Sequence, residues 1–81
     1  MNLDIQAWKD GKDIRHRSNI DIPEAKTWIV KTRGKVNEFD SISIQLYIPA
    51  FTVRGIQYMP YRYLDTKDWD DALDWLKKFE D

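Results

Sequence analysis

The chain of 81 residues contains no cysteine, which excludes disulfide bonds, thiolate nucleophiles and cysteine-ligated zinc. It has one histidine, His16, so a zinc site would need carboxylate ligands, and no spacing of acidic residues supports one. No stretch approaches the ~18 apolar residues of a membrane span, and the first residues lack the apolar segment of a secretory signal. We therefore expect no metal, no cofactor and no membrane partner, and a cytoplasmic location in a cell or a virus-infected host cell.

Glycine is also scarce, and its three residues are isolated, so no phosphate-binding loop is present. The Gly-x-Ser-x-Gly pattern of serine hydrolases is missing, and Ser41 and Ser43 fall in a plain strand pattern. His16 lies between Arg15 and Arg17 and is more readily an ordinary strand residue than a catalytic base. These absences predict that the chain is not an enzyme.

Aromatic residues and charges are plentiful. Four Trp, four Tyr and three Phe supply the buried area that a small core needs. Residues 1–63 carry ten Lys or Arg and seven Asp or Glu, whereas residues 64–81 carry three Lys and seven Asp or Glu. The net charge of −1 therefore conceals two oppositely charged regions, and such a separation can orient a binding partner.

Hydrophobic alternation predicts several strands within one domain of residues 1–81. An N-terminal hairpin is expected in residues 1–22, with its tight turn at Asp10-Gly11. A sheet is expected in residues 27–64, beginning with a strand at residues 27–33, which are rich in β-branched and aromatic side chains.

The cleanest strand pattern covers residues 41–48, and Pro49 is expected to end it because proline has no N–H for the ladder. The last strand includes residues 55–64. Pro60 requires that this strand lie at an edge of the sheet or be bulged there. The in/out alternation of side chains before Pro60 favours an outward-facing Tyr58, and the orientation of the other tyrosines in this strand stays open.

A C-terminal helix is predicted at residues 66–80, with Asp65 or Thr66 as its N-cap. Apolar residues recur there at helical spacing: Trp69, Ala72, Leu73, Leu76 and Phe79. Trp75 lies beside this stripe, where it either borders the core or is exposed. The expected fold class is α+β, with an antiparallel sheet of 4–5 strands and one C-terminal amphipathic helix packed on one face. The sheet residues expected beneath the helix are Trp28, Val30, Ile42, Ile44 and Leu46.

Four acidic residues gather in this helix: Asp68, Asp70, Asp71 and Asp74. They form a candidate acidic patch that could steer a partner or mimic nucleic acid. The alternative is a solvated helix face whose first turn favours negative charge.

The opposite face of the sheet is the candidate binding surface, because interface anchors are enriched in Tyr and Arg. Its expected partner-binding residues are Lys31, Arg33, Tyr47, Arg54, Tyr58, Tyr61 and Arg62, with Ile29, Ser43 and Gln45 beside them. The alternative is ordinary aromatic packing beneath the N-terminal hairpin.

The run KTWIVKTRG at residues 26–34 is followed by two further predicted strands and by LDTKDWDDALDWLKKFE at residues 64–80. This order resembles the three-stranded-sheet-plus-helix domains at the N-termini of tyrosine recombinases, which bind arm-type DNA sites through the sheet. The resemblance implies major-groove contacts from sheet residues: Lys31, Arg33, Tyr47 and Arg62.

The expected function is a small protein-binding module, such as a phage- or plasmid-encoded accessory protein that inhibits a host factor. The alternative is DNA or RNA binding through the aromatic and basic sheet face. Another protein is the expected partner, and an edge strand could also pair with its own copy in a homodimer.

Overall fold

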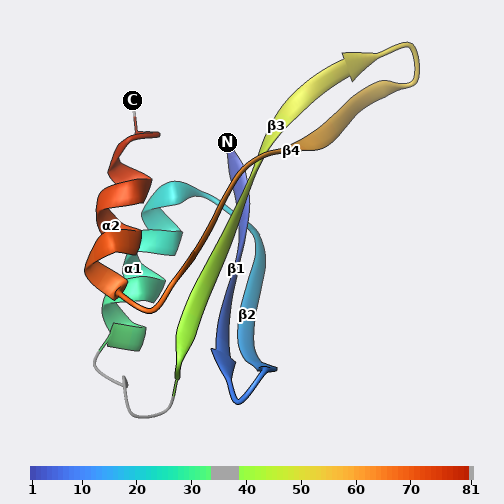
Figure 1. Cartoon of the computed structure of the whole chain (residues 1–81). Coiled ribbons are helices and arrows are strands. Elements are labelled where there is room, and N and C mark those ends of the chain that lie inside the picture. The colour runs from blue at the N-terminus through green and yellow to red at the C-terminus, as the bar shows by residue number, and fades with distance from the viewer. Residues whose placement is uncertain (34–38, 81) are drawn as a thin grey trace.

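The computed structural model describes residues 1–33 and 39–80 and contains one four-stranded antiparallel sheet with strand order β2-β1-β3-β4. The elements in chain order are β1 (Asn2–Lys9), β2 (Lys12–Ile20), α1 (Ile22–Arg33), β3 (Ser41–Thr52), β4 (Gly55–Thr66) and α2 (Trp69–Lys77). Both helices lie on one side of the sheet, and β3 and β4 continue beyond it together (Figure 1). This arrangement is the predicted α+β class, with one helix more than expected.

The N-terminal hairpin is confirmed, and it forms part of the sheet. Asp10 and Gly11 make the turn with φ of 53° and 77°, in the left-handed region that tight hairpin turns require. β1 then pairs with β3 on its other side, so β1 is a central strand. The hairpin therefore extends the sheet and does not fold over its open face.

The prediction of a strand at residues 27–33 is wrong, because these residues belong to α1. The backbone N–H of Glu24 donates to the Asp21 carboxylate at 2.9 Å, which caps the start of this helix. Its buried residues have helical spacing: Ile22, Ala25, Ile29 and Thr32. The sheet expected at residues 27–64 therefore begins at Ser41. For the same reason, this chain lacks the first strand on which the resemblance to tyrosine recombinase domains depends.

The core lies between the two helices and the inner face of the sheet. β1 contributes Leu3, Ile5 and Ala7, and β3 contributes Ile42, Ile44 and Leu46, in the predicted alternation. α1 and α2 cover them with Ile22, Ala25, Ile29, Trp69, Ala72 and Leu76. Of the residues predicted beneath the helix, Val30 lies instead on the exposed side of α1, and Trp28 is half-buried beside the core.

α2 has the predicted apolar stripe, with Leu73 and Phe79 half-buried at its border. Its start was predicted wrongly, since the N-cap is Asp68 and not Asp65 or Thr66. The Asp68 carboxylate accepts hydrogen bonds from the N–H groups of Asp70 and Asp71. Trp75 borders the core, with its ring centroid 4.9 Å from that of Phe79.

Asp68→Ala is expected to lower the free energy of unfolding by about 1 kcal/mol, because two helix N–H groups lose their acceptor. Asp71→Ala is the matched control, since it removes a carboxylate from the same turn and keeps the cap. Urea denaturation checks the pair. Equal losses for the two variants would contradict the cap.

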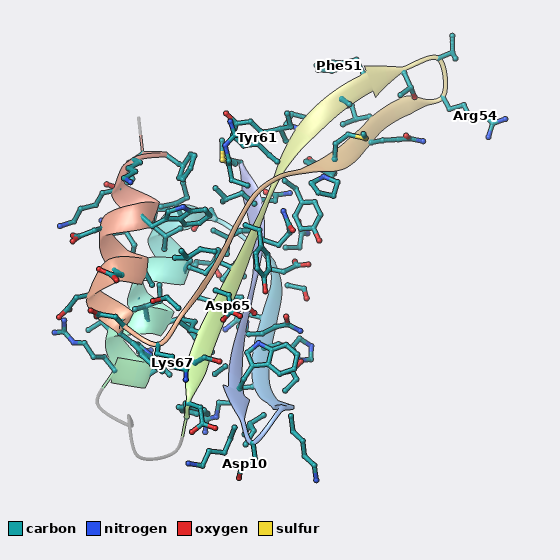
Figure 2. The ribbon with its side chains drawn as sticks, viewed as in Figure 1. Asp10, Phe51, Arg54, Tyr61, Asp65 and Lys67 are labelled. Atoms are coloured by element: carbon teal, nitrogen blue, oxygen red, sulfur yellow. The ribbon has the colours of Figure 1, made fainter. Side chains whose placement is uncertain are left out.

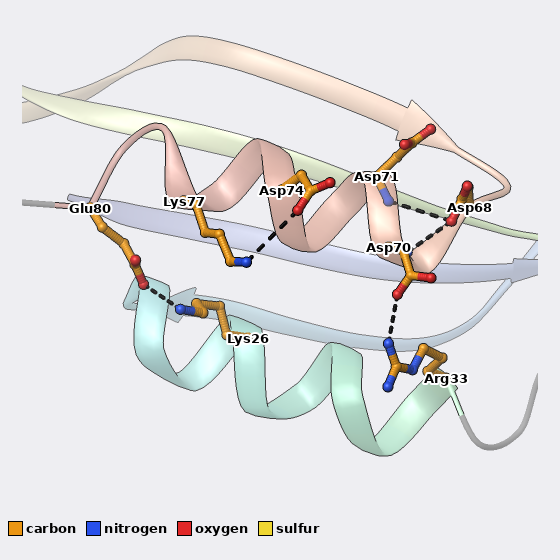
Figure 3. Close-up of polar contacts among 8 residues, drawn as sticks. All are labelled: Lys26, Arg33, Asp68, Asp70, Asp71, Asp74, Lys77 and Glu80. Atoms are coloured by element: carbon orange, nitrogen blue, oxygen red, sulfur yellow. Dashed lines mark hydrogen bonds and ion pairs between the residues drawn. The ribbon is translucent and has the colours of Figure 1, made fainter.

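Two ion pairs join α1 to α2, one at each end (Figure 3). Lys26 Nζ lies 2.6 Å from a Glu80 carboxylate oxygen, and Arg33 donates to Asp70 at 2.6 Å. The start of α1 therefore lies beside the end of α2, so the two helices run antiparallel.

β3 continues through Pro49 to Thr52, so the prediction that Pro49 ends the strand is wrong. β1 pairs with β3 only as far as Tyr47. Beyond that point one edge of β3 is free, so a residue without an N–H is tolerated there. Residues 48–61 form a two-stranded hairpin, here called the arm, which projects from the body (Figure 1). The molecule reaches 47 Å in its longest dimension.

Candidate functional site

No described residue covers the sheet face away from the helices, here called the open face, because both helices lie on the other side and the N-terminal hairpin lies in the plane of the sheet (Figure 1). Opposed residues of paired strands point to the same side of a sheet. The pairing therefore places these body residues on the open face: Asp4, Gln6, Trp8, His16, Ser43, Gln45, Tyr47 and Tyr63. Seven of them, without Trp8, line with Ser18 a shallow depression of about 260 Å³ that spans all four strands.

Hydrogen bonds between strands hold the side chains of this face in place. Trp8 Nε1 donates to Ser43 Oγ at 2.8 Å, and Ser43 Oγ donates to Gln6 Oε1 at 3.4 Å. Gln6 Nε2 donates in turn to the Asp13 carboxylate at 3.1 Å. The floor of the open face is consequently polar and fixed before any partner arrives, which lowers the entropy lost on binding.

Tyr47 has the most perturbed environment of the tyrosines on this face. Its hydroxyl donates to an Asp4 carboxylate oxygen at 3.2 Å. Burial raises the pKa of the Tyr47 phenol above its ordinary value, and the charge of Asp4 raises it further. The neutral phenol is therefore the form that the folded protein stabilises.

Because of this raised pKa, the free energy of unfolding depends on pH in the alkaline range. The stabilisation from Tyr47 is present below the ordinary phenol pKa of 10.0 and is lost as the pH rises through the higher pKa of the folded protein. As the pH rises from 9 to above 10, we expect the free energy of unfolding to fall further in the wild type than in Tyr47→Phe, because phenylalanine cannot ionise. Urea denaturation across this range checks it. Parallel pH curves for the two proteins would rule out the coupling.

The arm carries the two most exposed apolar side chains of the described residues, Val53 and Phe51. Phe51 is 83% exposed, Ile56 58% and Tyr58 54%, and Val53 and Met59 are also exposed. Figure 2 shows Phe51 and Arg54 on the far half of the arm, well away from the helices. Arg54 is the only charged residue between Ile48 and Tyr61. The arm thus presents an apolar, nearly uncharged ribbon to solvent.

The predicted partner-binding residues are only partly brought together. Tyr47 and Tyr58 share the open face, and Arg54 lies at the tip of the arm. Lys31 and Arg33 lie on α1, in the helix layer, because their segment is not a strand.

Tyr61 and Arg62 lie at the base of the arm on the helix side. The Tyr61 ring meets Phe79 edge-on at 6.3 Å, and the Arg62 guanidinium stacks 4.1 Å from the Tyr61 centroid. Pro60 satisfies both predicted conditions, since β4 is an edge strand and a register shift lies opposite it at Leu46/Tyr47. Tyr61, three residues after Tyr58, faces the opposite side and braces the arm against Phe79. The bulge reverses the parity beyond it, so that Arg62 lies on the helix side and Tyr63 on the open face.

The predicted acidic patch is divided among structural contacts (Figure 3). Asp68 caps α2, Asp70 pairs with Arg33, and Asp74 lies 3.8 Å from Lys77. Within the described residues no group of three or more His, Asp or Glu side chains could hold a metal ion. These contacts favour the interpretation of a solvated helix face.

His16 lies on the open face with its Nδ1 3.6 Å from an Asp13 oxygen, and its side chain is 62% exposed. The nearest serine in the hydrogen-bond network, Ser43, already donates to Gln6 and accepts from Trp8. The Ser43 hydroxyl is therefore not bonded to His16.

Sequence reasoning missed two parts of the surface. Phe51 was left between the two predicted strands, although the alternation of β3 continues past Pro49 and Gly55 marks a hairpin turn with φ of 116°. Ile56 lies in the predicted last strand but was not named as part of the surface. The β1 residues Asp4, Gln6 and Trp8 were missed because their place depends on β1 pairing with β3, which no local pattern specifies.

Comparisons with protein families, with characterised proteins and with solved structures found no match to this chain. Among the described residues, no helix has the length and apolar character needed to cross a bilayer.

Proposed function

We propose that this chain is a non-enzymatic protein-binding module that uses the arm as its apolar anchor and the open face as an adjoining polar surface. The observation that carries the proposal is the projection of Phe51, Ile56 and Tyr58 into solvent on a hairpin outside the core. Folding alone gives no reason to expose such residues, because they contribute nothing to the buried core.

The size of the apolar surface supports a protein partner. Phe51, Ile56 and Tyr58 share one face of the arm and offer on the order of 400 Å² together, which lies within the range of the largest patch on typical monomers. Aromatic residues also lose little conformational entropy on binding, which makes them effective anchors.

The open face adds specificity to this anchor. Its hydrogen-bonded floor meets the arm at Tyr47 and Tyr58, which line a smaller hollow of about 210 Å³ with Asn2, Asp4 and Asn19. A polar surface beside an apolar anchor is the usual composition of a non-obligate interface.

Nucleic-acid binding has weaker support. Lys31 and Arg33 lie in the helix layer, and the open face carries the carboxylates of Asp4 and Asp13. Phosphate binding needs clustered cations, and on this surface Arg54 at the tip is isolated.

We extend the proposal to a cytoplasmic accessory protein of a virus or plasmid that blocks a host factor. Its support is the small size and the charge asymmetry of the chain, with the acidic residues concentrated in residues 64–81. The arm would hold the host factor.

The test is photo-crosslinking in the cells that naturally contain the chain. Tyr58→p-benzoylphenylalanine places the reactive group on the arm, and the same amino acid at Val30 provides a control that is exposed to a similar degree on α1. We expect discrete protein adducts from position 58 and none shared with position 30. The yield of these adducts is expected to persist when salt is added to a lysate before irradiation, since apolar contacts change little with ionic strength.

Two outcomes would contradict the proposal. Identical adducts from both positions would show that the arm has no selective role. Crosslinks to nucleic acid from position 58, with binding that falls steeply as salt rises, would favour the alternative function.

A further inference from the structure

A groove lies at the base of the arm, between the start of α1, the end of α2 and β3. It has a volume of about 530 Å³. Apolar side chains of Ile22, Pro23, Ile48 and Phe79 line it, and Asp21 and Glu80 supply carboxylates. Among its described lining residues there is no lysine or arginine.

The tip of the arm has the opposite character. Phe51 and Val53 are its exposed apolar residues, and Arg54 is its only charge. Glu80 already pairs with Lys26, so Asp21 supplies the negative charge, and an apolar tip with one cation complements an apolar groove with one such carboxylate. The tip cannot enter its own groove, because the strands between them span roughly 17 Å for five residues.

We propose that two copies of this chain associate about a two-fold axis, with the tip of each arm seated in the groove of the other. Two arms that lie antiparallel bring each tip to the base of its partner, where the groove is located. The contact is the same in both directions and closes the assembly at two subunits. This inference rests on the proposed function of the arm and names a second copy as one protein that it binds.

The available area is sufficient for such a dimer. The exposed apolar side chains of one tip, Phe51 and Val53, offer on the order of 300 Å². The groove loses a similar area, so two such contacts bury about 1,200 Å² in total, the lower bound for a stable specific interface.

The other edge of the sheet is a poorer candidate for self-association. β2 carries Lys12, Arg15 and Arg17, and it has two register irregularities against β1. Charges and bulges of this kind protect an edge strand from pairing. The nearly uncharged arm lacks such protection.

The test measures the mass of the full chain by sedimentation equilibrium over a wide concentration range. We expect a reversible monomer–dimer equilibrium for the wild type. Arg54→Glu places an acid against Asp21 and Glu80, and Pro23→Arg places a cation in the groove opposite Arg54. Each variant alone is expected to weaken the dimer at least tenfold. Val30→Ser, on the outer side of α1, is the control that leaves the dimer unchanged.

Mixing the two charge variants gives the decisive result. The acidic tip of the Arg54→Glu copy then meets the basic groove of the Pro23→Arg copy. The other contact joins a wild-type tip to a wild-type groove. We expect a heterodimer at concentrations where each variant alone is monomeric. A monomeric wild type at all concentrations, or no rescue on mixing, would overturn the inference.

These results are separable from those of the proposed function. A monomeric chain whose position 58 still crosslinks to another protein would refute the dimer and retain the binding module. A dimer with charge rescue but no other protein captured would retain the dimer and refute the accessory-protein role.

Discussion

Ile29→Ala is expected to lower the free energy of unfolding by about 3 kcal/mol. Ile29 is completely buried on the inner side of α1, so the substitution removes apolar contacts and leaves a cavity. The melting temperature should fall by roughly 10–20 °C for a chain of this size. The loss is a large share of the ~5–10 kcal/mol that stabilises a small domain.

Val30→Ala provides the matched control, because Val30 is 53% exposed on the outer side of the same helix. Its effect is expected to stay within about 0.5 kcal/mol. Denaturant unfolding of both variants distinguishes helix from strand, since a strand at residues 27–33 would bury Val30 and expose Ile29. A larger loss for Val30→Ala than for Ile29→Ala would refute the helical assignment.

The double substitution Phe51→Ser and Tyr58→Ser is expected to weaken binding of the crosslinked partner by about 100-fold or more. Aromatic anchors in interfaces contribute about 2 kcal/mol or more each when they are hot spots. The melting temperature should change little, because both side chains lie outside the core. Titration calorimetry with the isolated partner measures the affinity.

Val30→Ser is the control for this second prediction, since it removes an exposed apolar side chain from the helix layer. It is expected to leave affinity unchanged. Unaltered affinity in the arm variant would exclude the arm as anchor. A large fall in its melting temperature would show that the arm is a structural element.

The sequence predicted the elements whose signals are local. The hairpin turn at Asp10-Gly11, the alternation of residues 41–48 and the apolar stripe of α2 each agree with their surroundings. Agreement between local propensity and burial pattern makes such elements predictable.

α1 was missed because its residues favour two structures at once. Trp28, Ile29 and Val30 have high β-propensity, yet the packing of Ala25 and Ile29 against the sheet outweighs that preference. A start signal was nevertheless present, since Asp21 and Glu24 have the spacing of a capping box, with Pro23 in the first helical turn.

The candidate site was predicted in part for a related reason. Tyr47 and Tyr58 were placed on one face because strand parity is a local rule. Arg62 was misplaced by the bulge opposite Pro60, which reverses the parity after it. Tyr61 lies three residues from Tyr58 and faces the helix side by plain alternation. Lys31 and Arg33 were misplaced with the helix that carries them.

The central claim is that one face of the sheet is covered by helices and the other is open, and the absence of cysteine allows a direct test. Tyr63→Cys introduces a thiol on the open face, and Ala72→Cys introduces one beneath the helices. In dilute native protein, we predict that a thiol reagent labels the first variant at the rate of an unfolded peptide and the second only on global unfolding. Equal protection of the two thiols would contradict the account.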